Sequence, residues 1–274
     1  MTEKLAIIAS GGGMTCSYTA GSVLGLVDKF KLTSPDIVIG GSGSAGTMSY
    51  YVSGQYDSIR NIWENLLATK EFISYPRFWK VIDIDYLIDK VFKEQVKLNT
   101  ENIYKSPIDF FIPLTNITTG LIEYFSNRDP SKNIFKAMRA TKAMPLVYGR
   151  QVQVGESDYC DTKLSSNLAA NVEKAKELGA EKIIAFNTSH SSPIVDAVLN
   201  QWVKAKSKTF RQNYSSELRR LQELSINDSV FLLSPATKPQ ASMLDNDQAA
   251  LKATVNQGYE ETVNNEQLEA YLNS

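Results

Sequence analysis

Histidine is the scarcest chemically important residue in this chain. Among 274 residues there is one, His190, in a polar loop after the apolar run 182–187. A serine–histidine–aspartate triad needs an imidazole as its base, so a triad here would have to use His190. We weigh two interpretations of this residue, a catalytic base and an exposed loop histidine. The clusters of ligands that a metal centre needs are also missing, and no metal is expected.

Cysteines and long apolar stretches are equally sparse. Two cysteines are too few for a disulfide scaffold, and their scarcity favours a reducing compartment. No run approaches the roughly 20 apolar residues that span a bilayer. The first residues lack the basic start and long apolar segment of a signal peptide. We therefore expect a cytoplasmic protein and leave peripheral contact with membranes open.

Excess charge of either sign is absent as well. Lys and Arg total 29 against 30 for Asp and Glu, a net charge of −1. This balance gives no electrostatic argument for binding nucleic acid. With 43% apolar residues the chain can bury a substantial core. Its length favours a single domain over residues 1–274.

Short apolar runs alternate with stretches of helical periodicity. We expect helices at 18–30 and at 166–178, the second ended by Gly179. Runs rich in β-branched and aromatic residues predict strands at 5–9, 36–39, 108–114, 123–126, 182–187 and 230–233. Such alternation predicts an α/β fold, a three-layer sandwich with a mostly parallel central sheet.

Two regions interrupt this alternation. Residues 56–97 are helical and aromatic, and we expect an insertion or cap there. Within it, Phe72, Phe78 and Trp79 would form either a lid at a lipid surface or an aromatic cap packed on the core. The C-terminal part, 193–274, is expected to be largely helical, beginning with one long helix over 193–224.

The first predicted strand runs into three glycines, Gly11, Gly12 and Gly13. Glycines at a strand end, before a helix, let backbone N–H groups converge on an anion. A dinucleotide loop, G-x-G-x-x-G, would need another glycine where Cys16 stands. From this segment alone, an oxyanion hole and a plain turn remain equally open.

The second predicted strand ends in Gly-Gly-Ser-Gly-Ser-Ala-Gly, residues 40–46. A strand, a glycine-flanked serine and a following helix are typical of a nucleophile elbow, whose sharp turn tolerates only small neighbours. Ser42 keeps the short distance to the strand that such a turn needs, so we choose it as the nucleophile. Ser44, which begins a Ser-Ala-Gly sequence, is the alternative.

A third segment, Tyr159-Cys160-Asp161-Thr162-Lys163, precedes the helix predicted at 166–178. Alone, Asp161 would be a turn or capping residue. Together the three segments resemble the patatin-like phospholipases, in which a glycine-rich loop, a G-x-S-x-G elbow and a late Asp-Gly-Gly or Asp-Gly-Ala segment occur in this order. Residues 140–145, Ala-Thr-Lys-Ala-Met-Pro, are similar to that family's A-S-x-A-x-P segment.

Two features depart from the family pattern. The arginine usual after the glycine loop is absent, with Thr15 and Cys16 in its neighbourhood. The glycines after the catalytic aspartate are replaced by Thr162 and Lys163. These departures favour, as one alternative, a catalytically impaired lipid-binding protein.

The resemblance implies a lipid acyl hydrolase or phospholipase A that needs no cofactor. It implies a dyad of Ser42 and Asp161 acting on a lipid or acyl-ester substrate. The implied oxyanion hole comprises Gly11, Gly12, Gly13 and Gly43. An ordinary aspartate, with a pKa near 3.9, is a weak base, so the pocket would have to raise this pKa by desolvation.

Two further functions stay open for the same residues. An acyltransferase would use the same serine with an alcohol or thiol as acceptor of the acyl group. A nucleotide-binding protein, more distantly, would use the glycine loop for a phosphate. The oligomeric state is not indicated by the sequence.

Overall fold

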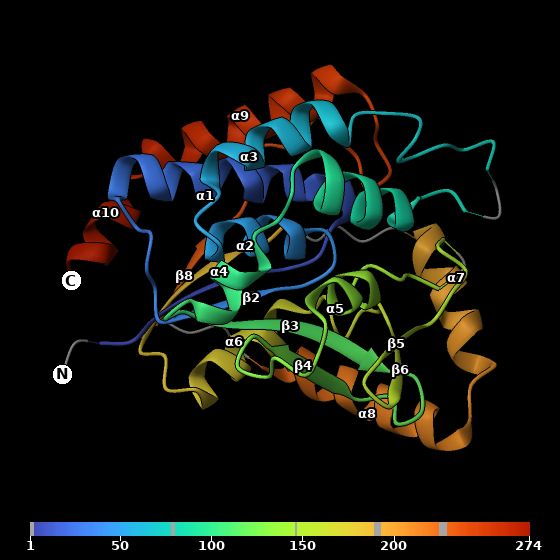
Figure 1. The fold of residues 1–274 in the computed structure, drawn as a ribbon. Coiled ribbons are helices and arrows are strands. Elements are labelled where there is room, and N and C mark those ends of the chain that lie inside the picture. The colour runs from blue at the N-terminus through green and yellow to red at the C-terminus, as the bar shows by residue number, and fades with distance from the viewer. Residues whose placement is uncertain (1–2, 78–79, 146, 189–192, 225–228) are drawn as a thin grey trace.

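The computed structural model describes residues 3–77, 80–145, 147–188, 193–224 and 229–274 (Figure 1). The strands are β1 Leu5–Ala9, β2 Ile37–Gly40, β3 Asp109–Asn116, β4 Ile122–Ser126, β5 Val152–Val154, β6 Ser157–Cys160, β7 Lys182–Phe186 and β8 Val230–Leu233. The α-helices are α1 Ser17–Phe30, α2 Ser44–Val52, α3 Tyr56–Asn61, α4 Thr100–Lys105, α5 Ile134–Ala140, α6 Leu168–Glu177, α7 Pro193–Lys204, α8 Lys208–Glu223, α9 Gln248–Val263 and α10 Glu266–Asn273. A 3₁₀ turn, η1 Gly13–Cys16, and two π-helices, η2 Ile62–Leu66 and η3 Tyr86–Gln95, complete the described elements.

The strands form one open sheet in the order β5-β6-β3-β2-β1-β7-β8, with β4 also paired to β3. Its centre is parallel, from β3 through β2, β1 and β7 to β8. The edge formed by β4, β5 and β6 is antiparallel. Helices cover both faces, so the prediction of a mostly parallel three-layer α/β fold is confirmed (Figure 1).

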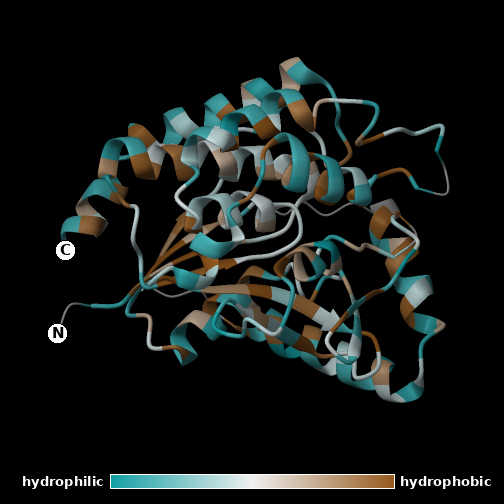
Figure 2. Cartoon of the chain, in the orientation of Figure 1, coloured by the Kyte–Doolittle hydropathy of each residue, from teal (hydrophilic) through white to brown (hydrophobic). Residues whose placement is uncertain are grey.

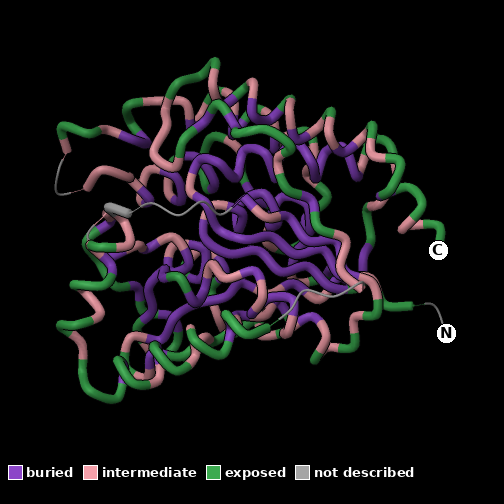
Figure 3. Tube along the Cα trace, turned by 180° about the vertical axis from the view of Figure 1, so that it is seen from behind, coloured by how far each residue is buried: buried purple, intermediate pink, exposed green. Residues whose placement is uncertain are grey.

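Both faces of the sheet are apolar, as expected of parallel strands between two helical layers. Along β1, Ile7 joins the large core beneath α1, α2 and α9, whereas Ile8 joins the core beneath α6. The central strands are hydrophobic in Figure 2 and buried in Figure 3, while the outer sides of the helices are polar and exposed. Of the helices within the described residues, none is long and apolar enough to cross a membrane.

Helices α1 and α9 pack with their backbones in contact. A Cβ atom on Gly21 would lie 1.8 Å from the carbonyl oxygen of Val255, and one on Gly258 would lie 2.1 Å from that of Tyr18. Only glycine permits this approach. The Tyr18 hydroxyl, which donates to Glu261 at 2.8 Å, fixes the register of the pair. The helix that follows the glycine loop is thus held by a helix from the C-terminal part.

The predicted strands appear within a residue or two of their expected positions, but two features differ. The hairpin of β5 and β6 was not expected, since each strand has only three or four residues. The single long helix over 193–224 is wrong, because the chain forms α7 and α8 instead. Ser207 caps α8 by accepting the Phe210 N–H at 3.1 Å, and Arg211 donates to the last carbonyl of α7, that of Lys204, at 2.9 Å.

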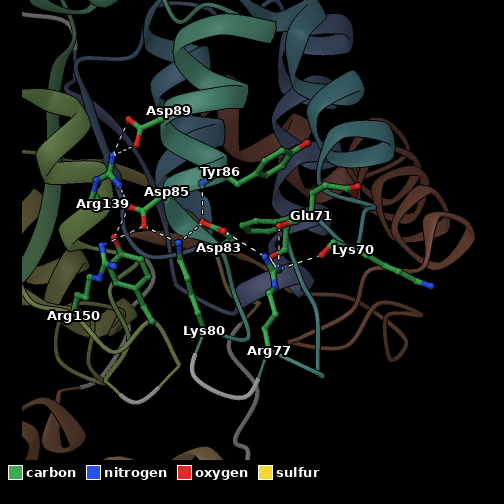
Figure 4. A network of polar contacts seen from close by, with 12 residues as sticks. Lys70, Glu71, Arg77, Lys80, Asp83, Asp85, Tyr86, Asp89, Arg139 and Arg150 are labelled. Atoms are coloured by element: carbon green, nitrogen blue, oxygen red, sulfur yellow. Dashed lines mark hydrogen bonds and ion pairs between the residues drawn. The ribbon is translucent and has the colours of Figure 1, made fainter.

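The segment 56–97 contains α3, η2 and η3, and a network of charged groups ties it to α5 (Figure 4). Asp85 accepts hydrogen bonds from Arg139 of α5 and, at 2.6 Å, from Tyr148. Lys80 lies 2.8 Å from the same carboxylate, and Arg139 also reaches Asp89 at 2.9 Å. These contacts hold the pKa of Asp85 below its usual value, against the effect of its partial burial.

We predict that Asp85→Ala lowers the free energy of unfolding by about 1–3 kcal/mol, because it leaves Arg139 and Lys80 half-buried without a shared partner. Urea unfolding measures the change. Lys90→Ala is the matched control, since the Lys90–Glu94 pair in η3 is 59% exposed on both sides and should contribute no more than about 0.5 kcal/mol. Equal effects of the two substitutions would contradict a structural role of the network.

Candidate active site

The turn between β2 and α2 places Ser42 in a left-handed conformation, with φ 49°. Among the described residues other than glycine, only Lys31 shares a positive φ. This conformation is unfavourable for a residue with a side chain and is typical of a nucleophile elbow. It projects the serine side chain away from the strand and the helix that flank it.

The flanking glycines are required because other backbone segments lie directly against the turn. A Cβ on Gly41 would lie 2.8 Å from the carbonyl oxygen of Ser165, in the segment after Asp161. A Cβ on Gly43 would lie 2.5 Å from the carbonyl oxygen of Gly13, in the glycine loop. All three sequence segments therefore meet at the elbow.

The two serines of the elbow have different surroundings. Ser42 lines a cleft and a cavity that both include Asp161. Ser44 is the first residue of α2 and is fully buried. Its hydroxyl donates to the carbonyl oxygen of Ser10 at 2.5 Å, bracing the glycine loop from within.

Asp161 follows β6 directly and is only 3% exposed. Its N–H donates to the carbonyl oxygen of Ala143 at 3.0 Å, and its Oδ1 accepts from the Ser165 hydroxyl at 3.1 Å. Burial raises the pKa of this carboxyl to about 7, although the Ser42 and Ser165 hydroxyls and the charge of Lys142 act in the opposite direction. The group is thus a stronger base than an ordinary aspartate, and it interacts with Ser42.

The turn after Asp161 does not need the glycines that the family pattern would place there. Thr162 and Lys163 are not among the residues with positive φ. The Thr162 hydroxyl lies 2.8 Å from the Thr115 hydroxyl. The backbone N–H of Thr162 donates to the Ser165 hydroxyl at 3.0 Å. Side-chain hydrogen bonds therefore stabilise this turn.

The glycine loop carries backbone donors beside the elbow. The Gly11 N–H donates to the carbonyl oxygen of Ser166 at 3.3 Å. No acceptor in the described part of the chain bonds the N–H groups of Gly12, Gly13 and Gly43. Where the family pattern has an arginine, the Thr15 hydroxyl lies 2.8 Å from the carbonyl oxygen of Gly12 and braces the loop.

Ser42 and Asp161 lie at the junction of two spaces of different character. A cleft of about 300 Å³ continues past them with a mixed lining, in which polar side chains (Thr162, Lys163, Ser166, Asn167 and Asp196) alternate with apolar ones (Met144, Leu168, Val195, Leu199 and Met243). A smaller cavity of about 60 Å³ has mainly apolar walls: Met14, Trp63, Leu67, Phe72, Ile82, Ile84, Leu87 and Leu244. Most of the apolar wall comes from the segment 56–97.

Sequence reasoning missed three residues of this site. Thr141, Lys142 and Ala143 form the segment after α5 and contact both Ser42 and Asp161. The similarity of residues 140–145 to a family motif was the available signal, but it assigned them no role. Lys142 also lines the apolar cavity, and burial lowers its pKa to about 8.

Three residues named in the sequence analysis cannot be placed in this site. His190, Phe78 and Trp79 lie outside the described residues. Phe72 is buried and lines the apolar cavity. Within the described ranges, His, Cys, Asp and Glu side chains do not gather in groups of three that would suit a metal ion.

Comparisons with known proteins bear on the family and the fold of this chain. The family model of the patatin-like phospholipases matches residues 7–172, more than half of the chain. Among solved structures, the chain is similar to VipD from Legionella pneumophila, with a TM-score of 0.50 and 14% identity over 98% of this chain and 67% of that one. At this identity the likeness concerns the fold alone. No curated protein sequence matches the chain. The chain belongs to the patatin-like phospholipase family.

Proposed function

We propose that this protein is a serine hydrolase of lipid acyl esters, of the phospholipase A or lipid acyl hydrolase type. Ser42 is the nucleophile and Asp161 the general base. The observation that carries the proposal is that Ser42, on its left-handed turn, lines the same cleft and cavity as Asp161, a buried carboxyl whose pKa is raised to about 7. A general base works best when its pKa lies near the working pH.

In this mechanism Asp161 accepts the proton of Ser42 as its oxygen attacks the ester carbonyl. The carbonyl oxygen gains negative charge, which the N–H groups of Gly12, Gly13 and Gly43 are available to stabilise. The proton returns from Asp161 to the departing alcohol, and an acyl-serine forms. Water, deprotonated by Asp161, then attacks the acyl-serine and releases the acid and Ser42.

The two spaces beside Ser42 suit the two parts of such an ester. The apolar cavity offers an apolar surface to an acyl chain, whose burial there is favourable. The larger cleft, whose mixed lining includes Lys163, Asn167 and Asp196, offers polar groups to the alcohol part and a route for water. This division supports a lipid ester over a compact polar substrate.

We predict that Ser42→Ala reduces hydrolysis of p-nitrophenyl butyrate and phospholipid vesicles at least about 10³-fold. Ser44→Ala is the matched control, since it removes the same hydroxyl two residues along. It should remain active and lose about 1 kcal/mol of stability with the bond to Ser10. Covalent labelling with a fluorophosphonate, followed by mass spectrometry, identifies the serine that reacts. Modification of Ser44 would overturn the assignment, and a folded wild-type protein without label would favour a lipid-binding protein that does not hydrolyse.

Asp161→Asn should abolish hydrolysis yet increase stability at neutral pH. The carboxyl ionises above about pH 4 in the unfolded chain but only near 7 in the folded protein. Folded wild-type protein therefore loses stability as pH rises between these values, by at most about 1.4 kcal/mol per pH unit. Asp161→Asn does not lose stability in this way, because its amide does not ionise. Urea unfolding at pH 4, 5.5 and 7 measures the difference, and a difference independent of pH would contradict the raised pKa.

A third prediction concerns the acyl chain. Leu87 is buried and lines the apolar cavity, so Leu87→Phe should narrow it. We expect kcat/KM for a dodecanoyl ester to fall at least about tenfold relative to a butyryl ester. The butyryl ester is the internal control, because overpacking that costs about 1–3 kcal/mol of stability would affect both substrates alike. An unchanged ratio would show that the chain binds elsewhere.

A further inference from the structure

The three residues after α5 touch both partners of the proposed dyad. The Thr141 hydroxyl accepts the N–H of Ser42 at 2.9 Å. The carbonyl oxygen of Ala143 accepts the N–H of Asp161 at 3.0 Å. One short segment thus fixes the backbone of both residues, and Lys142 lies between its two anchoring points.

Lys142 directs its ammonium group at the elbow. Its Nζ donates to the carbonyl oxygen of Ser42 and, at 3.3 Å, to that of Gly43. The Ser42 carbonyl and the Gly43 N–H belong to one peptide unit. A cation on the carbonyl oxygen polarises the amide and makes its N–H a stronger donor. That N–H has no acceptor in the described part of the chain.

We propose that Lys142 is a positioning residue that holds the Ser42–Gly43 peptide and strengthens the Gly43 N–H as a donor to the developing oxyanion. The inference rests on the proposed function, because it assigns Lys142 a part in the same reaction. It places positive charge next to the oxyanion loop from a segment far along the chain.

A purely space-filling role explains the position of Lys142 less well. Its side chain lines the apolar cavity beside Trp63, Leu67 and Leu87. Burying an ammonium group there has a desolvation cost that an apolar side chain of similar length would avoid. The two elbow carbonyls provide the compensating hydrogen bonds, which implies that the charge itself has a use at the elbow.

The titratable groups that act on Lys142 determine how its role depends on pH. Burial lowers its pKa to about 8, and the negative charge of Asp161 partly opposes this shift. Burial also raises the pKa of the Cys16 thiol, which therefore stays neutral in this range. Activity should rise as Asp161 loses its proton near pH 7 and fall as Lys142 loses its own near pH 8.

The test compares Lys142→Met and Lys142→Arg with wild type on p-nitrophenyl butyrate from pH 5.5 to 9.5. For Lys142→Met we expect kcat to fall about 10- to 100-fold, less than the loss of a whole oxyanion donor, with KM unchanged. The alkaline decline should disappear. The acidic limb should move to higher pH, because the positive charge no longer lowers the pKa of Asp161. Lys142→Arg should recover part of kcat and keep the rate up to higher pH.

The control is Lys136→Met, which makes the same change on an exposed residue of α5 and should leave kcat and its pH profile unchanged. Wild-type kcat and an intact alkaline limb in Lys142→Met would overturn the role of Lys142. If Lys142→Met does not fold, the test is the rate at which a fluorophosphonate labels wild-type protein, measured as a function of pH. A labelling rate that stays level up to pH 9.5 overturns the inference. A wild-type protein that neither hydrolyses the ester nor is labelled on Ser42 would instead refute the proposed function.

Discussion

The left-handed backbone turn at Ser42 is the constraint on which the rest of the site depends. A turn this tight leaves no room for side chains beside it, so the flanking glycines bring other backbones into contact. The glycine loop after β1 and the segment after Asp161 are both positioned by these contacts. The parallel pairing of β1 and β2, with Ala9 opposite Gly40, makes the arrangement possible because both loops leave the sheet at the same edge.

Burial is what makes the proposed chemistry feasible, and it has a cost in stability. Asp161 is almost inaccessible to solvent, which raises its pKa to about 7 and suits it to act as a base. The same desolvation makes its ionised form unfavourable in the folded protein. Nearby hydroxyls and the Lys142 ammonium group reduce this penalty without removing it. A desolvation penalty that is only partly compensated is typical of functional sites, where activity takes precedence over stability.

The parts of the structure that local sequence determines could be predicted. Runs rich in β-branched and aromatic residues predicted the central strands, and the glycine-flanked serine predicted the turn at Ser42. What could not be predicted depends on contacts between distant segments. The break between α7 and α8 has no glycine or proline at it and depends on caps from Ser207 and Arg211. The position of Lys142 at the elbow follows from how α5 packs against the sheet, which neither spacing nor periodicity encodes.

The contact between α1 and α9 also bears on how the protein matures on the ribosome. α1 continues directly from the glycine loop. Its Gly21 contacts the backbone of α9, which leaves no space for a side chain at position 21. In the chain, α9 follows every segment of the candidate site. A nascent chain therefore exposes the glycine loop, Ser42 and Asp161 long before the helix that anchors α1 has been synthesised. The packing that holds α1 behind the glycine loop can therefore form only after translation has passed α9.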